Sequence, residues 1–96
     1  MELNFDFLDE IDKQDITDMY DEYTLNQIDN DNVKRIYDYL FEQGIEYPKD
    51  IFIERLELFL QDSTDFIVKF EELKKEIGTD YAEKISENTE YLDKMY

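Results

Sequence analysis

The two glycines of this chain, Gly44 and Gly78, lie 34 residues apart, and each follows a run of apolar residues at helical spacing. The first run consists of Val33, Ile36, Tyr37, Leu40 and Phe41, and the second of Phe66, Ile67, Phe70, Leu73 and Ile77. Glycine readily adopts the left-handed conformation that often ends a helix, because it has no Cβ atom. Two helices are therefore expected, each ending at one of these glycines.

Residues that favour helix starts lie before both runs and after both glycines. Asp29–Asp31 precedes the first run, and Ser63 or Thr64 precedes the second, so these residues are candidate N-caps. After the first glycine, Pro48 suits the first turn of a helix that continues through Ile51, Arg55, Leu58 and Phe59. After the second, Thr79 is expected to cap a last helix with Tyr81, Ala82, Ile85 and Leu92.

An offset of 34 residues aligns the two halves of this region. It pairs Asn30 with Thr64, Val33 with Ile67, Ile36 with Phe70, Gly44 with Gly78, Tyr47 with Tyr81, Ile51 with Ile85 and Leu58 with Leu92. We expect an all-α fold in which residues 29–62 and 63–96 form two stacked helical hairpins of an approximate repeat. The alternative is that two hairpins share this period by chance.

Two families of helical repeats share features with this pattern. The period of 34 equals that of tetratricopeptide repeats, but Pro48 follows Gly44-x-x-Tyr47, where that repeat would continue a helix, so we exclude it. The spacing of Gly44-Ile45, Ile51 and Leu58-Phe59 is loosely similar to the helical repeats of mitochondrial transcription terminators. Those repeats bind nucleic acid through basic surfaces, whereas this chain is acidic, so the similarity implies no function.

Residues 1–28 lie outside the repeat and complete a predicted single domain of residues 1–96. Phe5, Leu8 and Ile11 are expected on one face of a short helix. Ile16, Met19, Tyr20 and Tyr23 are expected on another, with a break around Gln14–Asp15. The prediction is an acidic N-terminal helical segment that packs on the hairpins or orders on binding.

The charge of the chain restricts its partners. With 27 acidic and 10 basic residues the net charge is −17, which repels nucleic acid and anionic membranes and attracts basic proteins. Residues 1–32 carry eleven acids and one base, a balance of −10, against −7 for residues 33–96. Hydrophobic residues still make up 42% of the chain, with seven Phe and eight Tyr, so a folded core is expected.

The inventory of side chains argues against catalysis, metal and cofactors. The chain has neither His nor Cys, which excludes a catalytic triad and a zinc site of the usual kind. Asp29–Asn32 begins like a calcium loop, but Lys34 replaces the turn glycine and Leu40 replaces the bidentate glutamate, so a helix cap is expected instead. The isolated glycines form no phosphate-binding loop. We expect a protein that is not an enzyme.

No secretion signal and no apolar stretch of about 20 residues is evident, so a cytoplasmic location is expected.

Aspartates recur every three residues in the N-terminal segment. The candidate partner-binding residues are Asp6, Asp9, Asp12, Asp15, Asp18 and Asp21, joined by Glu10 and Glu22, with Tyr20 and Tyr23 as apolar anchors. On a helix, three residues advance about 4.5 Å and turn about 300°. Carboxylates would then lie at intervals close to those of phosphates on a nucleic-acid strand. The plain alternative is a solvated surface that keeps the protein soluble.

These patterns lead to a function hypothesis with alternatives. The leading one is a DNA-mimic-like inhibitor, of phage or mobile-element origin, that blocks a nucleic-acid-handling enzyme such as a CRISPR effector or restriction nuclease. An immunity protein or antitoxin that neutralises a basic toxin would share the small size and acidity. A structural adaptor would instead bind through apolar helix faces, and its binding would resist salt. Exposed Tyr and Phe side chains are also compatible with a homodimer.

Overall fold

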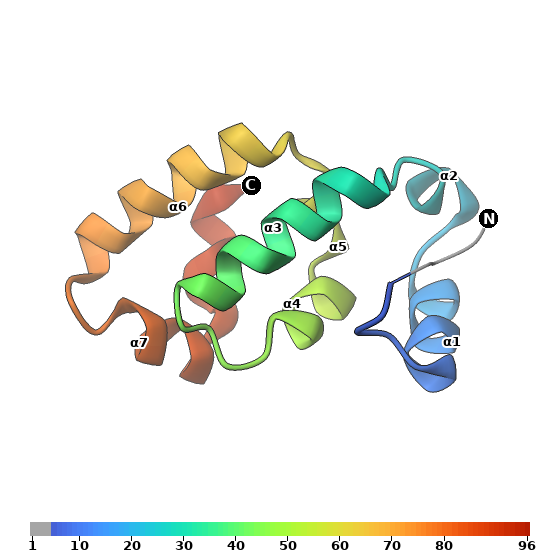
Figure 1. Cartoon of the computed structure of the whole chain (residues 1–96), viewed down its shortest axis with the longest axis horizontal. Helices are drawn as coiled ribbons and strands as arrows, with labels where there is room; N and C mark the ends of the chain where they lie inside the picture. The colour runs from blue at the N-terminus through green and yellow to red at the C-terminus, as the bar shows by residue number, and fades with distance from the viewer. Residues whose placement is uncertain (1–4) are drawn as a thin grey trace.

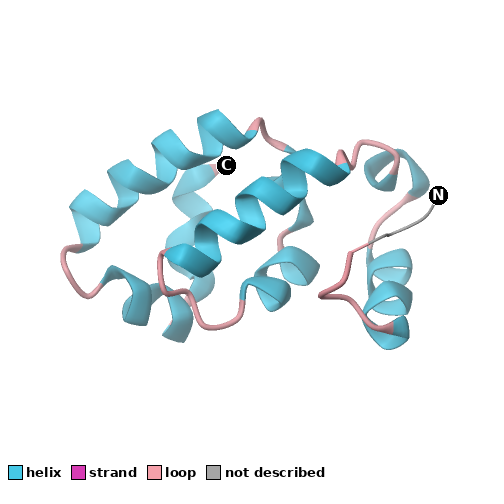
Figure 2. Ribbon diagram, viewed as in Figure 1, coloured by secondary structure: helices cyan, strands magenta, loops and turns pink. Residues whose placement is uncertain are grey.

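The computed structural model describes residues 5–96, and every regular element in this range is helical. The two long helices are α3 (Asn30–Glu42) and α6 (Ser63–Ile77). The shorter elements are α1 (Glu10–Met19), α2 (Glu22–Leu25), α4 (Pro48–Glu54), α5 (Leu56–Leu60), α7 (Tyr81–Glu87) and a 3₁₀ helix, η1 (Thr89–Met95). Figure 2 shows these helices joined by loops, which confirms the predicted all-α class. Residues 1–4, the start of the predicted N-terminal segment, lie outside the described range.

The molecule is elongated, with extents of 38 × 23 × 20 Å. Helix α3 packs against α4, α5 and α6, and η1 packs against α6 and α7. In Figure 1, α1 and α2 lie at one end of the long axis and α7 lies at the other. Helix α1 contacts α4. Among the described residues, no helix is both long enough and apolar enough to cross a bilayer.

Aromatic side chains form the centre of the core. Phe52, Phe59, Phe66 and Phe70 are fully buried. The Phe52 and Phe59 rings meet edge to face with centroids 5.1 Å apart, an arrangement that the ring quadrupoles favour. Aliphatic residues of α3, α5 and the C-terminal elements complete the core, among them Val33, Ile36, Leu40, Leu56, Leu58, Ile85 and Leu92. The apolar stripes predicted for α3 and α6 thus face each other, but the prediction was wrong for Phe41, which is 68% exposed.

Both glycines have the positive φ that the sequence predicts. Gly44 has φ 85° and follows α3, and Gly78 has φ 101° and follows α6. The Ile45 N–H donates to the Leu40 carbonyl at 3.2 Å across the first of these ends, which satisfies a carbonyl that the helix leaves free. Each glycine therefore lets the chain reverse direction after a long helix.

The caps of the two long helices are aspartates. Asp29 accepts hydrogen bonds from the Asp31 and Asn32 N–H groups, which confirms the predicted cap of α3. The prediction of Ser63 or Thr64 as the cap of α6 was wrong by one residue, because Asp62 accepts from the Thr64 and Asp65 N–H groups. Ser63 is instead buried, and its N–H donates to the Asn32 Oδ1 atom at 2.8 Å.

The second helix of each predicted hairpin is divided in two. Arg55 (φ −133°, ψ 51°) separates α4 from α5, and Asn88 (φ −143°, ψ 96°) separates α7 from η1. Asn88 accepts a hydrogen bond from the Glu90 N–H and so caps η1. The cap position of α7 is Asp80, not Thr79 as predicted, and Asp80 makes no capping bond through its side chain. The order of elements is the same in both halves, and the 34-residue repeat stays a prediction.

The prediction for the N-terminal segment was wrong in two respects. Helix α1 runs without interruption through Gln14–Asp15, and the break falls at Tyr20, whose extended backbone (φ −121°, ψ 145°) precedes α2. Phe5 and Leu8 lie before α1 and are buried, whereas Ile11 is exposed. The reason is that Asp9 caps α1, so the helix begins only at Glu10 and turns Ile11 outward.

Candidate functional site

We call residues 5–28 the acidic arm, and they contain all of the predicted site residues. The six aspartates of the predicted stripe fall in three different local structures. Asp6 lies in a turn, Asp9 is the N-cap of α1, and Asp21 is the N-cap of α2. Asp12, Asp15 and Asp18 belong to α1. The arm therefore does not present one uninterrupted helical ladder.

Asp9 and Asp12 form a capping box at the start of α1. The Asp12 N–H donates to the Asp9 Oδ1 atom at 2.8 Å, and the Asp9 N–H donates to the Asp12 Oδ2 atom at 3.1 Å. The carboxylate of Asp12 also lies 3.2 Å from the Lys49 Nζ atom of α4. The hydrogen bond with the Asp9 backbone and the ion pair with Lys49 lower the pKa of Asp12 below its usual value. Asp9 thus fixes the start of α1, and Asp12 in addition joins α1 to α4.

Asp21 has a similar local role at the start of α2. It accepts a hydrogen bond from the Thr24 N–H at 2.8 Å, and hydrogen bonding to Thr24 lowers the pKa of Asp21. Asp18 is exposed and accepts a bond from the Gln14 Nε2 atom at 2.9 Å. Glu10 and Glu22 are exposed as well, and Lys13 lies 3.8 Å from the Glu10 carboxylate.

Helical geometry explains why the α1 aspartates do not share a face. Each step of three residues falls about 60° short of a full turn, so Asp12 and Asp18 project in directions about 120° apart. Asp12 points toward α4, as its ion pair with Lys49 shows. Asp15 and Asp18 are exposed and form no ion pair within residues 5–96. Of the three, these two have the carboxylates that a partner could reach.

The two tyrosines of the predicted site have different environments. Tyr20 is half-buried, and its hydroxyl donates to the Ile53 carbonyl at 2.7 Å and accepts from the Leu56 N–H at 3.2 Å. Burial raises the pKa of Tyr20 above its usual value. The hydroxyl therefore satisfies backbone groups at the break between α4 and α5. Tyr23, in contrast, is 77% exposed.

Sequence reasoning missed two exposed apolar residues of the arm. Ile11 is 72% exposed and Met19 is 55% exposed, although both were expected on the apolar faces of short helices. Ile16 is the only residue of α1 that is buried. A stricter test of the helical angle could have found this, because Ile11 lies five residues before Ile16 and so about 140° away around the helix.

A second polar cluster lies between α3, α6 and α7, away from the arm. The Tyr39 hydroxyl donates to the Glu71 carboxylate, which also lies 3.0 Å from the Lys74 Nζ atom. Lys74 and the Tyr81 hydroxyl both donate to the Gln43 Oε1 atom, at 2.8 and 2.9 Å. Burial and the bond to Glu71 raise the pKa of Tyr39, while that bond lowers the pKa of Glu71. These shifts keep Tyr39 protonated and Glu71 charged, which suits a structural link.

Within residues 5–96, no three carboxylates converge in a way that could hold a metal ion. A shallow hollow of about 350 Å³ between α4 and the α7–η1 junction is lined by Tyr47, Asp50, Glu54, Glu87 and Glu90, among others.

Comparison of the chain with known protein families, with curated proteins and with solved structures finds no match.

Proposed function

We propose that this protein binds a basic protein through its carboxylate surface, without covalent chemistry, and inhibits a nucleic-acid-handling enzyme as a DNA mimic. The observation that carries this proposal is the excess of exposed carboxylates without a basic partner. Residues 5–96 contain 26 of the 27 acidic residues, since Glu2 alone lies outside, and all ten basic ones. The five ion pairs in this range engage only five of those acids.

The charge density of the molecule supports mimicry. With 26 acids and ten bases, residues 5–96 carry a net −16 along a longest extent of 38 Å, or one charge per about 2.4 Å. Duplex DNA carries one charge per about 1.7 Å of its axis. A groove that attracts DNA by long-range electrostatics would therefore attract this protein by the same field.

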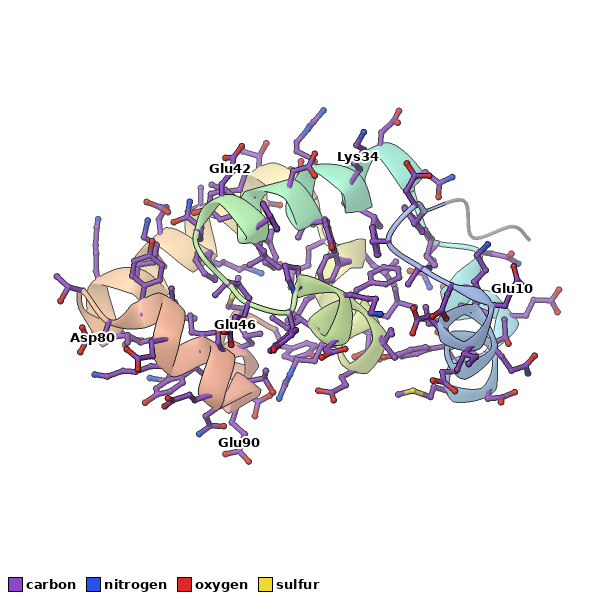
Figure 3. All side chains as sticks on the ribbon, turned by 60° about the horizontal axis from the view of Figure 1, so that its bottom comes forward. Glu10, Lys34, Glu42, Glu46, Asp80 and Glu90 are labelled. Carbon is purple, nitrogen blue, oxygen red and sulfur yellow. The ribbon has the colours of Figure 1, made fainter. Side chains whose placement is uncertain are left out.

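The distribution of the acids also fits contact with a concave partner. The acids labelled in Figure 3, Glu10, Glu42, Glu46, Asp80 and Glu90, are all exposed and come from both ends and the middle of the chain. An elongated molecule with exposed acids at both ends and between them can enter a basic groove lengthwise. The preferred targets are a CRISPR effector, a restriction nuclease or a comparable DNA-binding enzyme.

The first test is affinity capture from the host's lysate, washed at about 0.1 M and then about 0.5 M salt, with captured proteins identified by mass spectrometry. Raising the salt shortens the Debye length from about 10 Å, so charge-driven binding should weaken strongly. Each captured enzyme is then purified, and its binding of duplex DNA is measured with and without this protein.

Competition with DNA that disappears at the higher salt supports the proposal. Capture of a basic toxin that binds no DNA would favour an immunity protein instead. A partner that survives the high-salt wash and leaves DNA binding unchanged would contradict charge mimicry and favour an adaptor.

A further inference from the structure

Helix α1 carries large apolar side chains on the side that the protein leaves uncovered. Ile11 and Met19 are 72% and 55% exposed, yet the rest of that side is acidic and polar. Exposed apolar residues are common singly, but two on one helix face form a pattern that partner helices and grooves recognise.

Helical geometry places these residues together with the two accessible aspartates of α1. With 100° per residue, Ile11, Asp15, Asp18 and Met19 fall within an arc of about 100°. Their spacing, i, i+4, i+7 and i+8, is that of a continuous stripe along one side of a helix. Ile16 and Asp12, which face the body of the protein, lie outside this arc. We call these four residues the outer stripe of α1.

The helix is held firmly enough to present this stripe. The capping box fixes its first turn, the pair of Asp12 with Lys49 joins it to α4, and the Tyr20 hydroxyl anchors its C-terminal end. Helix α1 lies at one end of the long axis (Figure 1), where it packs against α4. Figure 3 shows Glu10 at the outer edge of that end.

The charges of the outer stripe of α1 indicate which kind of partner can bind it. A second copy of the chain would bring Asp15 and Asp18 toward their own counterparts, and like charges in contact are destabilising. Nucleic acid and anionic membranes would meet the same repulsion. A protein groove with basic residues along its sides and apolar residues at its base would neutralise the aspartates and bury Ile11 and Met19 together.

We propose that the outer stripe of α1 docks into a basic groove of a partner protein, with Ile11 and Met19 as apolar anchors and Asp15 and Asp18 as its charged contacts. This proposal rests on the charge-driven function above, and adds to it the binding face and the chemistry of the groove. Tyr20, which is used inside the fold, takes no part.

A defined probe tests the stripe without a known partner. The probe is a helical peptide of about 18 residues made of Leu and Lys, with the Leu residues on one face. A peptide of the same length with Lys alone serves as the purely cationic control. Affinity is measured by fluorescence anisotropy at about 0.1 M salt, and the contact face by amide chemical-shift changes in NMR spectra.

Two matched double variants test whether Ile11 and Met19 bind the peptide themselves or whether any loss of exposed apolar surface lowers the affinity. Ile11→Ser with Met19→Ser is expected to lower affinity for the Leu/Lys peptide about tenfold, which corresponds to about 1.4 kcal/mol. Phe41→Ser with Val68→Ser removes apolar residues of similar exposure, 68% and 55%, and should leave affinity within about twofold. Neither double variant should change the affinity for the Lys-only peptide.

The charged contacts have their own matched control. Asp15→Lys with Asp18→Lys should weaken binding more than Glu83→Lys with Glu87→Lys, which changes net charge equally on exposed positions of α7. Shift changes should concentrate in residues 11–19. Equal losses from both pairs, or shifts spread over the whole surface, would overturn the docking face while leaving charge-driven binding intact. Failure of both peptides to bind at low salt would overturn the docking face and the proposed function together.

Discussion

The acidic arm and the remainder of the described residues, 29–96, which we call the body, are stabilised in different ways. In α6 the core-facing side buries Ser63, Phe66, Phe70 and Leu73, whereas α1 buries only Ile16. The arm as a whole is attached by separated apolar residues, Phe5, Leu8, Ile16 and Leu25, and by a few directed polar contacts. The body thus depends on continuous packing, and the position of the arm depends on individual contacts that single substitutions can remove.

The largest loss of stability is expected from a substitution that creates a cavity in the core of the body. Phe70→Ala removes a fully buried ring that lies 6.1 Å from the Phe66 ring, and should lower the free energy of unfolding by about 3–5 kcal/mol. Urea denaturation followed by circular dichroism measures the change. Phe41→Ala removes an exposed ring and should change stability little. Similar losses in both variants would contradict the assignment of the core.

Tyr20→Phe should lower the free energy of unfolding less than Phe70→Ala, and its effect should lie mainly in the acidic arm. The variant leaves the Ile53 carbonyl and the Leu56 N–H without their hydrogen-bond partner, and should cost about 1–3 kcal/mol. Hydrogen exchange should speed up in residues 10–25 and around the α4–α5 break before it changes in α6. Tyr23→Phe, at an exposed position, is the control. Uniform acceleration in all helices would show that arm and body open as one unit.

The capping box predicts a dependence on pH. Since the pKa of Asp12 is lowered in the folded state, its contribution to stability is present above the unfolded pKa of about 3.8 and is lost as pH falls through the lower folded value. Asp12→Asn should therefore destabilise the protein at pH 7, and its difference from the wild type should be smaller at pH 3 than at pH 7. Urea titrations at both pH values measure this difference.

The partner of Asp12 provides a check on this interpretation. In a Lys49→Met background, part of the Asp12→Asn effect should be missing, because the ion pair is already absent. The share that remains belongs to the hydrogen bond with the Asp9 N–H. An effect of Asp12→Asn that persists unchanged at pH 3 would assign it to packing instead of charge.

The smallest change in stability is expected from a substitution on the outer stripe of α1. Asp15 is exposed and forms no ion pair within residues 5–96, so Asp15→Asn should change the free energy of unfolding by less than about 0.5 kcal/mol. Thermal denaturation of the two proteins side by side would detect a larger shift. A marked loss of stability would mean that this side of α1 serves the fold, which would weaken its assignment to binding.

Local rules predicted much of the body from the sequence. The apolar spacing located α3 and α6, and the glycines located their ends, because these features depend on residues within one or two turns. The break at Arg55 could not be predicted in this way. It coincides with hydrogen bonds to the Tyr20 hydroxyl, which comes from a residue more than 30 positions earlier.

The candidate site was predicted less well than the fold, for a related reason. Aspartate is a good N-cap as well as a surface residue, so a repeat of Asp every three positions does not reveal which carboxylates are used internally. Asp9, Asp12 and Asp21 cap helices or join them, whereas Asp15 does neither, and Asp18 accepts only a hydrogen bond from the exposed Gln14 side chain. The exposure of Ile11 followed from the cap at Asp9, which fixes where the helix begins.

The hydroxyl of Tyr20 also bears on the order in which the chain folds. Its two hydrogen bonds join residues 33 and 36 positions apart, so the chain must close a long loop before they can form. The backbone groups that it binds are in place only once α4 and α5 have formed. The arm should therefore dock after the transition state for folding, and its substitutions should speed unfolding while leaving the folding rate nearly unchanged.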